Sequence, residues 1–179
     1  MTEDLQVRTY RNGDSIFYCK NKNDWDSATN NDIPACCHMY FDSLKGKEFG
    51  LLYNWFAVDD PRGLAPRGYK IPNVKDWKQL ISFSGGKSTA GRNLKASDGS
   101  WFPYENYVCE DKYNFKAKPS INVQDPEGTN WGKYGKWWTS DTATDGYFAK
   151  FTAMGYGSDE CNVSEWFKSM GLTVRCLKK

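Results

Sequence analysis

Histidine is almost missing from this sequence, and it has no long apolar run. The only histidine among 179 residues is His38. A single histidine makes a Ser-His-Asp or Cys-His catalytic group unexpected and leaves few nitrogen ligands for a metal. The longest apolar stretch, residues 51–58, is interrupted by Asn54 and is far shorter than the roughly 20 residues that cross a bilayer. We therefore expect no catalysis of the triad type and no membrane insertion.

A strong charge of one sign is also missing. The chain has 24 basic and 22 acidic residues spread along its length, for a net charge of +2. No strong field exists to attract a phosphate backbone, so nucleic acid is not an expected partner. The first five residues lack the basic and apolar regions of a secretory signal, so the sequence as written carries no targeting signal, unless one was removed.

Cysteines occur in an even number, but their spacing defines no site. It leaves any disulfide pairing open, and without a secretory signal we expect mostly reduced thiols. Cys36 and Cys37 are adjacent and lack the two-residue gap with which a pair closes around zinc. The acidic residues Asp145 and Asp159 and their neighbours lack EF-hand spacing and are interpreted as solvated loop charges, so we predict no metal and no cofactor. The six cysteines are Cys19, Cys36, Cys37, Cys109, Cys161 and Cys176.

Aromatic residues are unusually abundant. They make up 16% of the chain, including eight Trp and eleven Tyr. Flat rings with a polar edge, placed in Gly-rich segments, suit stacking on sugar faces or anchoring a protein contact. Packing in the interior is the alternative for each ring and stays open. The candidate ligand-binding residues, one acidic neighbour included, are Trp131, Tyr134, Asp141, Tyr147, Tyr156 and Trp166.

The first part of the chain shows mixed local patterns. Asn12-Gly13 between two β-forming runs, 7–10 and 15–18, predicts an opening hairpin. Residues 20–32 are polar and rich in Asn, Asp and Lys, which predicts a loop. The short apolar run 49–58 fits either a buried strand or a helix, and we favour the helix.

The clearest helix follows Asn73. This residue is a good N-cap, Asp76 comes three residues later, and an apolar face ends at Gly85-Gly86. These glycines precede Lys-Ser-Thr as at the end of a P-loop, but they follow a helix instead of opening one, so a C-cap is predicted. No linker or repeat divides the chain, and we predict one α+β domain over residues 1–179. Beyond Ala90 no helical period appears, and strands are expected at 136–140, 147–152 and 172–177.

Several short motifs occur in an order that a known family shares. They are Asn12-Gly13-Asp14, Tyr53-Asn54-Trp55-Phe56-Ala57-Val58, Gly68-Tyr69-Lys70-Ile71-Pro72, Trp137-Trp138-Thr139-Ser140 and Val174-Arg175-Cys176. In this order they resemble the Fibrobacter succinogenes major paralogous domain, FISUMP, and the likeness extends over nearly the whole chain. One departure is Ala65, where the family has a Cys before Pro. If that Cys normally pairs with the one matched by Cys176, this bridge is absent here.

The resemblance implies a C-type-lectin-like fold. Such a fold has two short helices and a small twisted antiparallel sheet that support a long loop region. On this basis residues 53–58 begin the first helix and residues 73–82 form the second. Trp55, Trp77 and one of the pair Trp137-Trp138 are then expected in the core.

The resemblance also favours binding over catalysis. We predict a non-enzymatic surface binding or adhesion domain, a phage virion component of the head or tail decoration or receptor-binding type, which recognises a bacterial surface glycan or a protein receptor. The expected location is the virion surface, or the cell surface if a signal peptide was removed. A structural virion subunit that docks on neighbouring subunits and a bacterial cell-surface protein are the alternatives, and homo-oligomer formation stays open. An oxidase of the formylglycine-generating type, with Cys161 and Cys176 as its thiols, is the least favoured.

Overall fold

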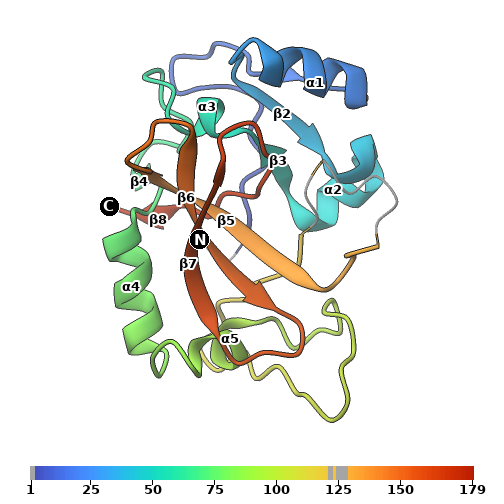
Figure 1. Ribbon diagram of the computed structural model, residues 1–179, viewed down its shortest axis with the longest axis vertical. Helices are drawn as coiled ribbons and strands as arrows, with labels where there is room; N and C mark the ends of the chain where they lie inside the picture. The colour runs from blue at the N-terminus through green and yellow to red at the C-terminus, as the bar shows by residue number, and fades with distance from the viewer. Residues whose placement is uncertain (1–2, 121–122, 124–128) are drawn as a thin grey trace.

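Small sheets and short helices make up the structure shown in Figure 1. It is a computed structural model, and it describes residues 3–120, 123 and 129–179. The helices are α1 (Lys22–Asn30), α2 (Ser43–Phe49), α3 (Trp55–Val58), α4 (Val74–Phe83) and α5 (Ala90–Leu94), with one 3-10 turn, η1 (Met39–Phe41). The strands are β1 (Phe17–Tyr18), β2 (Ala35–His38), β3 (Leu51–Tyr53), β4 (Tyr69–Lys70), β5 (Tyr134–Thr142), β6 (Phe148–Gly155), β7 (Cys161–Phe167) and β8 (Leu177–Lys178).

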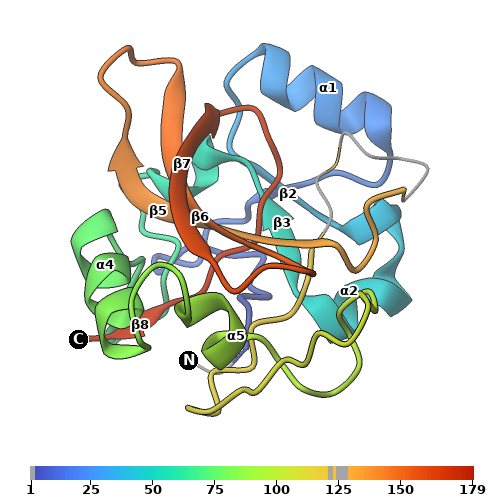
Figure 2. The same cartoon turned by 60° about the horizontal axis from the view of Figure 1, so that its bottom comes forward.

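Three sheets form the framework. Strands β5, β6 and β7 are antiparallel neighbours in that order, β2 pairs in parallel with β1 and antiparallel with β3, and β4 pairs with β8. Figures 1 and 2 both place α4 and α2 on opposite sides of the β5-β6-β7 sheet. The α+β class is confirmed. The expectation of two helices is wrong, because the described residues contain five α-helices.

Helix α4 begins and ends where the sequence predicts. The Asn73 side chain accepts a hydrogen bond from the Asp76 backbone N–H, and the Asp76 carboxylate accepts one from the Asn73 N–H, which completes a capping box. At the other end Gly86 donates to the Ile81 carbonyl and Gly85 to that of Ser82, and both glycines have positive φ. This is a Schellman C-cap, so the predicted helix and its glycine stop are confirmed.

Residues 20–32 contain a helix, so the predicted loop is wrong. Asn21 caps α1 by accepting a hydrogen bond from the Asp24 N–H at 2.9 Å. Trp25 and Ala28, three residues apart, are buried on one side of the helix. Two apolar residues give a weak periodic signal, and the tertiary burial of Trp25 stabilises a helix that local preference alone would not.

One buried asparagine divides the apolar run 49–58 into strand β3 and helix α3. The Asn54 side-chain oxygen accepts hydrogen bonds from the N–H groups of Ala35 and Ala57, and its amide nitrogen donates to the Ile33 carbonyl. Asn54 is fully buried, so these partners replace water. The predicted helix is therefore confirmed only for its second half, because a short run shows no periodicity that would separate strand from helix.

The opening hairpin is a turn with a single bridge. Thr9 pairs with Ser15, and Ile16 donates a hydrogen bond to the Arg8 carbonyl at 2.8 Å. Gly13 has a φ of 93°, which suits glycine at a tight turn. The strand that follows, β1, pairs in parallel with β2, so the hairpin does not extend.

The second half contains the expected strands and two elements that were not expected. Strands β5 and β6 include residues 136–140 and most of 147–152. Strand β7 and the short helix α5 were not predicted. Within 172–177, Leu172 and Thr173 form only isolated bridges, and regular pairing resumes in β8. Residues 172–176 are buried and bridge first to Tyr53 and then to Trp137, so they form no continuous ladder with one strand.

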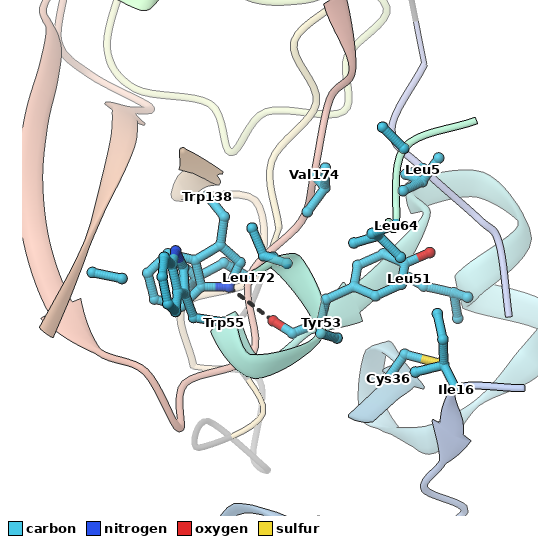
Figure 3. Packing of buried hydrophobic residues seen from close by; sticks show 14 of the residues in the cluster. Leu5, Ile16, Cys36, Leu51, Tyr53, Trp55, Leu64, Trp138, Leu172 and Val174 are labelled. Carbon is cyan, nitrogen blue, oxygen red and sulfur yellow. Dashed lines mark hydrogen bonds between the residues drawn. The ribbon is translucent and has the colours of Figure 1, made fainter. Parts of the chain in front are cut away.

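Trp138 belongs to the core cluster that Figure 3 shows. Its indole N–H donates to the Tyr53 carbonyl at 2.8 Å, the dashed line in Figure 3. The indole N–H of Trp55 donates to a carbonyl of β5 at 3.2 Å. Both rings thereby fill the core and join β5 to β3 and α3. The core positions of Trp55 and Trp77 are confirmed, and Trp137 and Trp138 are both buried, where only one was expected.

A buried ion pair joins the two ends of the chain to the central sheet. The Arg175 Nε donates to the Asp4 carboxylate at 2.6 Å, and the two side chains are 3% and 4% exposed. Trp137 Nε1 donates to the same carboxylate at 3.0 and 3.1 Å. The other Arg175 nitrogens donate to the carbonyls of Phe115 and Lys116. Four segments that are distant in sequence therefore meet at this pair.

Lys95 is fully buried and fixes the loop after β6. Its ammonium donates to the carbonyls of Gly155 and Ser158, both at 2.7 Å. The Tyr107 ring lies 4.2 Å from this nitrogen, and the Tyr107 hydroxyl donates to the Ser158 carbonyl at 3.0 Å. Burial lowers the pKa of Lys95 to about 8.

Removing one partner of the Asp4–Arg175 pair is expected to destabilise the protein strongly. Asp4→Ala leaves a buried guanidinium without its carboxylate, which costs about 3–5 kcal/mol of unfolding free energy. Denaturant unfolding measures this loss. The control is Lys22→Ala, which breaks the exposed Lys22–Asp26 pair and should cost about 1 kcal/mol or less. Equal losses in the two variants would contradict the role assigned to the buried pair.

The Lys95 ammonium is expected to titrate near pH 8, below the usual lysine pKa of 10.5. Burial disfavours the charged form, so the folded protein releases this proton at lower pH than the unfolded chain. The stability that Lys95 contributes therefore rises between these two pH values, and Lys95→Met should lack that rise. NMR of the lysine Nζ gives the midpoint, and a value near that of an exposed lysine would refute the effect of burial.

Candidate functional site

The predicted ligand-binding residues lie in several places and do not form one site. Trp131 lines a cleft beside α2, and Tyr156 lines a neighbouring hollow. Tyr134 and Trp166 share a patch on the face of the β5-β6-β7 sheet. The other two predicted residues line neither the cleft nor the hollow. The structure thus brings the six residues together only in part.

A cleft of about 730 Å³ lies between η1, α2 and the segment that precedes β5. The Trp131 ring meets Phe49 edge to face, with centroids 4.7 Å apart and an interplanar angle of 79°, and it lies 6.1 Å from the Tyr40 ring. Such packing holds the rings in fixed orientations. We name this site the Trp131 cleft, and its lining residues are Tyr40, Asp42, Leu44, Glu48, Phe49, Gly99, Ser100 and Trp131.

The backbone at one edge of the Trp131 cleft is strained. Tyr40 and Phe41 both have a φ of 55°, in the left-handed region that bulky residues avoid. Each such residue costs about 1–3 kcal/mol and persists where the surrounding structure imposes it, often at binding sites. Asp42 follows directly and accepts a hydrogen bond from the Leu44 N–H at 2.8 Å, at the start of α2. This turn directs the Tyr40 ring towards Trp131.

Beside the Trp131 cleft lies a smaller aromatic hollow of about 200 Å³, named here the Tyr156 hollow. Tyr156 meets Phe102 and Tyr104 edge to face, with centroids 5.8 and 5.3 Å apart. Trp101 forms part of the wall and is fixed by its indole N–H, which donates to the Ala117 carbonyl at 2.8 Å. The aromatic lining residues of the hollow are Trp101, Phe102, Tyr107 and Tyr156.

The cleft and the hollow adjoin, because Gly99 lines both. The Phe102 N–H donates to the Gly132 carbonyl, and the Tyr156 N–H donates to that of Lys133, both at 2.8 Å. These bonds tie the loop after α5 and the turn after β6 to the segment that carries Trp131. Figure 2 shows this loop beside α2. The result is one continuous aromatic surface held by backbone hydrogen bonds, which lowers the entropy cost of binding.

The sheet patch already holds a cation of the protein itself. The Lys136 ammonium lies 4.1 Å from the Trp166 ring centroid and 5.4 Å from that of Tyr134. Trp166 also packs against the core ring of Phe151, with centroids 5.8 Å apart. A ligand on this patch would have to share the two rings with Lys136.

Tyr147 and Asp141 lie near the turn between β5 and β6. Tyr147 is 77% exposed, and its N–H donates to the Asp145 carboxylate at 3.0 Å. The Asp141 carboxylate accepts a hydrogen bond from the Val74 N–H at the start of α4, where a negative charge is favourable. Asp159 pairs with Arg92 at 3.0 Å. Asp141, Asp145 and Asp159, which the sequence suggested as solvated charges, therefore bond to other groups of the protein.

The cysteines offer no activated thiol. Cys109 is half-buried, and the other five cysteines are buried. Burial raises the pKa of Cys161 to about 12 and that of Cys176 to about 11. These two residues also belong to different core clusters. A thiol that stays protonated is a poor nucleophile, so this pair is unsuited to thiol oxidation chemistry.

The group Cys36-Cys37-His38 forms part of β2 and is buried. The His38 Nδ1 lies 2.6 Å from the Tyr18 hydroxyl, and burial lowers the pKa of His38. In the described part of the chain, no three or more His, Cys, Asp or Glu side chains are placed to hold a metal ion. Within the same residues, no helix has the length and apolar character needed to cross a membrane.

Several residues of the aromatic surface were missed by sequence reasoning. Trp101 and Phe102 lie near Gly99 and Pro103, the same kind of Gly-rich aromatic context that identified Trp131, so this signal was available. Tyr40 and Phe49 gave no such signal. They come from the first half of the chain, and only the tertiary structure places them beside Trp131.

Comparison with known proteins identifies a family. No curated protein and no solved structure is significantly similar to the chain. The sequence model of the family described as Fibrobacter succinogenes major domain matches residues 1–178. This match covers nearly the entire chain and agrees with the ordered motifs found in the sequence. The chain therefore belongs to the Fibrobacter succinogenes major domain family.

Proposed function

We propose that this protein is a non-enzymatic binding domain that recognises a surface glycan with its continuous aromatic surface. The observation that carries the proposal is the Trp131 cleft. There three packed aromatic rings and two carboxylates, Asp42 and Glu48, line an open cavity of about 730 Å³. Rings stack on the apolar faces of sugars, and carboxylate oxygens accept hydrogen bonds from sugar hydroxyls.

The Tyr156 hollow extends the binding surface, so a ligand longer than one sugar unit can contact more of it. Because Gly99 lies between the two cavities, an oligosaccharide with one unit in the cleft would reach the hollow with another. Two linked weak contacts bind more tightly than either alone. We therefore propose an oligosaccharide as the ligand, in preference to a monosaccharide.

A catalytic role is not part of this proposal. The described residues of the cleft include neither histidine nor cysteine, and the thiols proposed for an oxidase, Cys161 and Cys176, are buried with raised pKa values. Binding needs only what the cleft has, namely fixed rings and hydrogen-bond acceptors.

The setting that we propose is the surface of a phage virion, with a bacterial cell surface as the alternative. Cys19, Cys36, Cys37, Cys109 and Cys161 form no disulfide, which supports folding in a reducing cytosol, where virions assemble. We also propose that the fold is C-type-lectin-like. The small β5-β6-β7 sheet and the described residues between α5 and β5, which lie outside the helices and strands and carry much of the aromatic surface, support this assignment.

A docking role has separate support from a second surface. The rings of Phe148 and Phe167 lie 4.4 Å apart, and Phe167 is 51% and Tyr147 77% exposed. Exposed rings that gather in one place favour a protein partner. Phe167→Ser should weaken self-association or binding to purified virion proteins, as measured by sedimentation. If the wild-type protein stays monomeric and binds none of these proteins, the docking role is wrong.

The glycan proposal predicts that Trp131→Ala loses binding. The glycans would first be identified on an array of bacterial surface oligosaccharides. Truncating a central aromatic anchor costs about 2 kcal/mol or more, roughly a 30-fold rise in Kd, which titration calorimetry measures. The matched control is Phe83→Ala on α4, an aromatic residue that is 69% exposed on the opposite side of the sheet, and it should bind like the wild type.

Two outcomes would count against this site. If Trp166→Ala or Tyr134→Ala abolishes binding and Trp131→Ala does not, the ligand binds the sheet patch. If the folded wild-type protein binds no oligosaccharide on the array and no whole bacterial cells, the glycan proposal itself is wrong.

A further inference from the structure

We infer that the Trp131 cleft selects sugars that carry a positively charged amino group, such as an unacetylated hexosamine. This inference rests on the proposed glycan-binding function and adds to it the charge of the ligand. It depends on three features of the cleft: the ring faces, the carboxylates and the sign of the charge around them.

The ring faces of the cleft suit a cation. A positive charge is attracted to the face of an aromatic ring when it lies within about 6 Å of the ring centroid. The protein already uses one cleft ring in this way, because the Lys118 ammonium lies 5.3 Å from the Phe49 centroid. Tyr40 and Trp131 line the same cavity, so a ligand ammonium there would lie among aromatic rings.

The two carboxylates add charge of the required sign. Glu48 is 60% exposed and lies 3.5 Å from the Lys118 ammonium, so this carboxylate already attracts a cation at the cleft. Asp42 accepts a hydrogen bond from the Leu44 N–H with one oxygen. A carboxylate has two oxygens with several acceptor positions, so both residues can also accept from a ligand ammonium.

The described lining residues of the cleft carry two carboxylates and contain neither Lys nor Arg. Lys118 lies just outside the lining and is shared between Glu48 and Asp98, at 3.5 and 3.4 Å. The described lining is thus net negative. A neutral sugar gains only stacking and hydrogen bonds there, whereas an ammonium sugar gains the charge attraction as well.

The test compares two oligosaccharides of equal length, a glucosamine hexamer and its fully N-acetylated counterpart, at a pH of about 6 where the free amines are protonated. We expect the glucosamine hexamer to bind the wild-type protein about tenfold more tightly in titration calorimetry. Raising the salt concentration should reduce this ratio, because salt screens exposed charges.

Two conservative variants isolate the carboxylates. Asp42→Asn keeps a residue that caps helices well, and Glu48→Gln keeps the size of an exposed side chain, so both should fold. Each variant is expected to lower the affinity ratio of the two hexamers towards one. Asp26→Asn on α1, which changes a carboxylate outside the cleft, should leave this ratio unchanged. Trp131→Ala should weaken the binding of both oligosaccharides.

Equal affinities for the two hexamers, or a ratio that survives in Asp42→Asn, Glu48→Gln and their combination, would overturn the selection for charge. Binding of neither hexamer would overturn it as well. None of these results decides the glycan proposal, which the array of surface oligosaccharides tests separately with neutral and charged members.

Discussion

The buried contact between Asp4, Arg175 and Trp137 is the constraint on which the rest of the structure depends. A charge removed from water is stable only where its partners are fixed, so this ion pair requires the N-terminal segment, strand β5 and the C-terminal segment to meet at one point. Trp138 follows on β5 and belongs to the core cluster of Figure 3, where its indole N–H donates a hydrogen bond to the Tyr53 carbonyl. The orientation of β5 thereby sets the packing on both faces of its sheet.

The long region between α5 and β5 is held to this frame by side chains that donate to backbone carbonyls. Arg175 reaches Phe115 and Lys116, Trp101 reaches Ala117, and Lys95 holds the turn after β6. The aromatic surface carried by these residues is fixed without a ligand, which suits the proposed binding function.

The framework and the proposed binding surface use different polar groups. Asp4, Asn54 and Arg175 are buried with their hydrogen bonds made inside the protein, so changing one of them disturbs the fold. The residues of the Trp131 cleft contribute rings and exposed carboxylates, and Glu48 can change without leaving a buried group unpaired. This carboxylate of the proposed binding surface can therefore vary while the core is kept.

The sequence by itself determined the features that depend on near neighbours. Asn73, Asp76 and Gly85-Gly86 specify α4 through contacts within a few residues, and β-forming runs with turn residues between them specify β5 and β6. Only the tertiary structure decided that residues 20–32 contain a helix, that Asn54 ends a strand, and that Tyr40 lies beside Trp131. These depend on burial and on hydrogen bonds between distant segments, and such contacts leave no periodic trace in the local sequence.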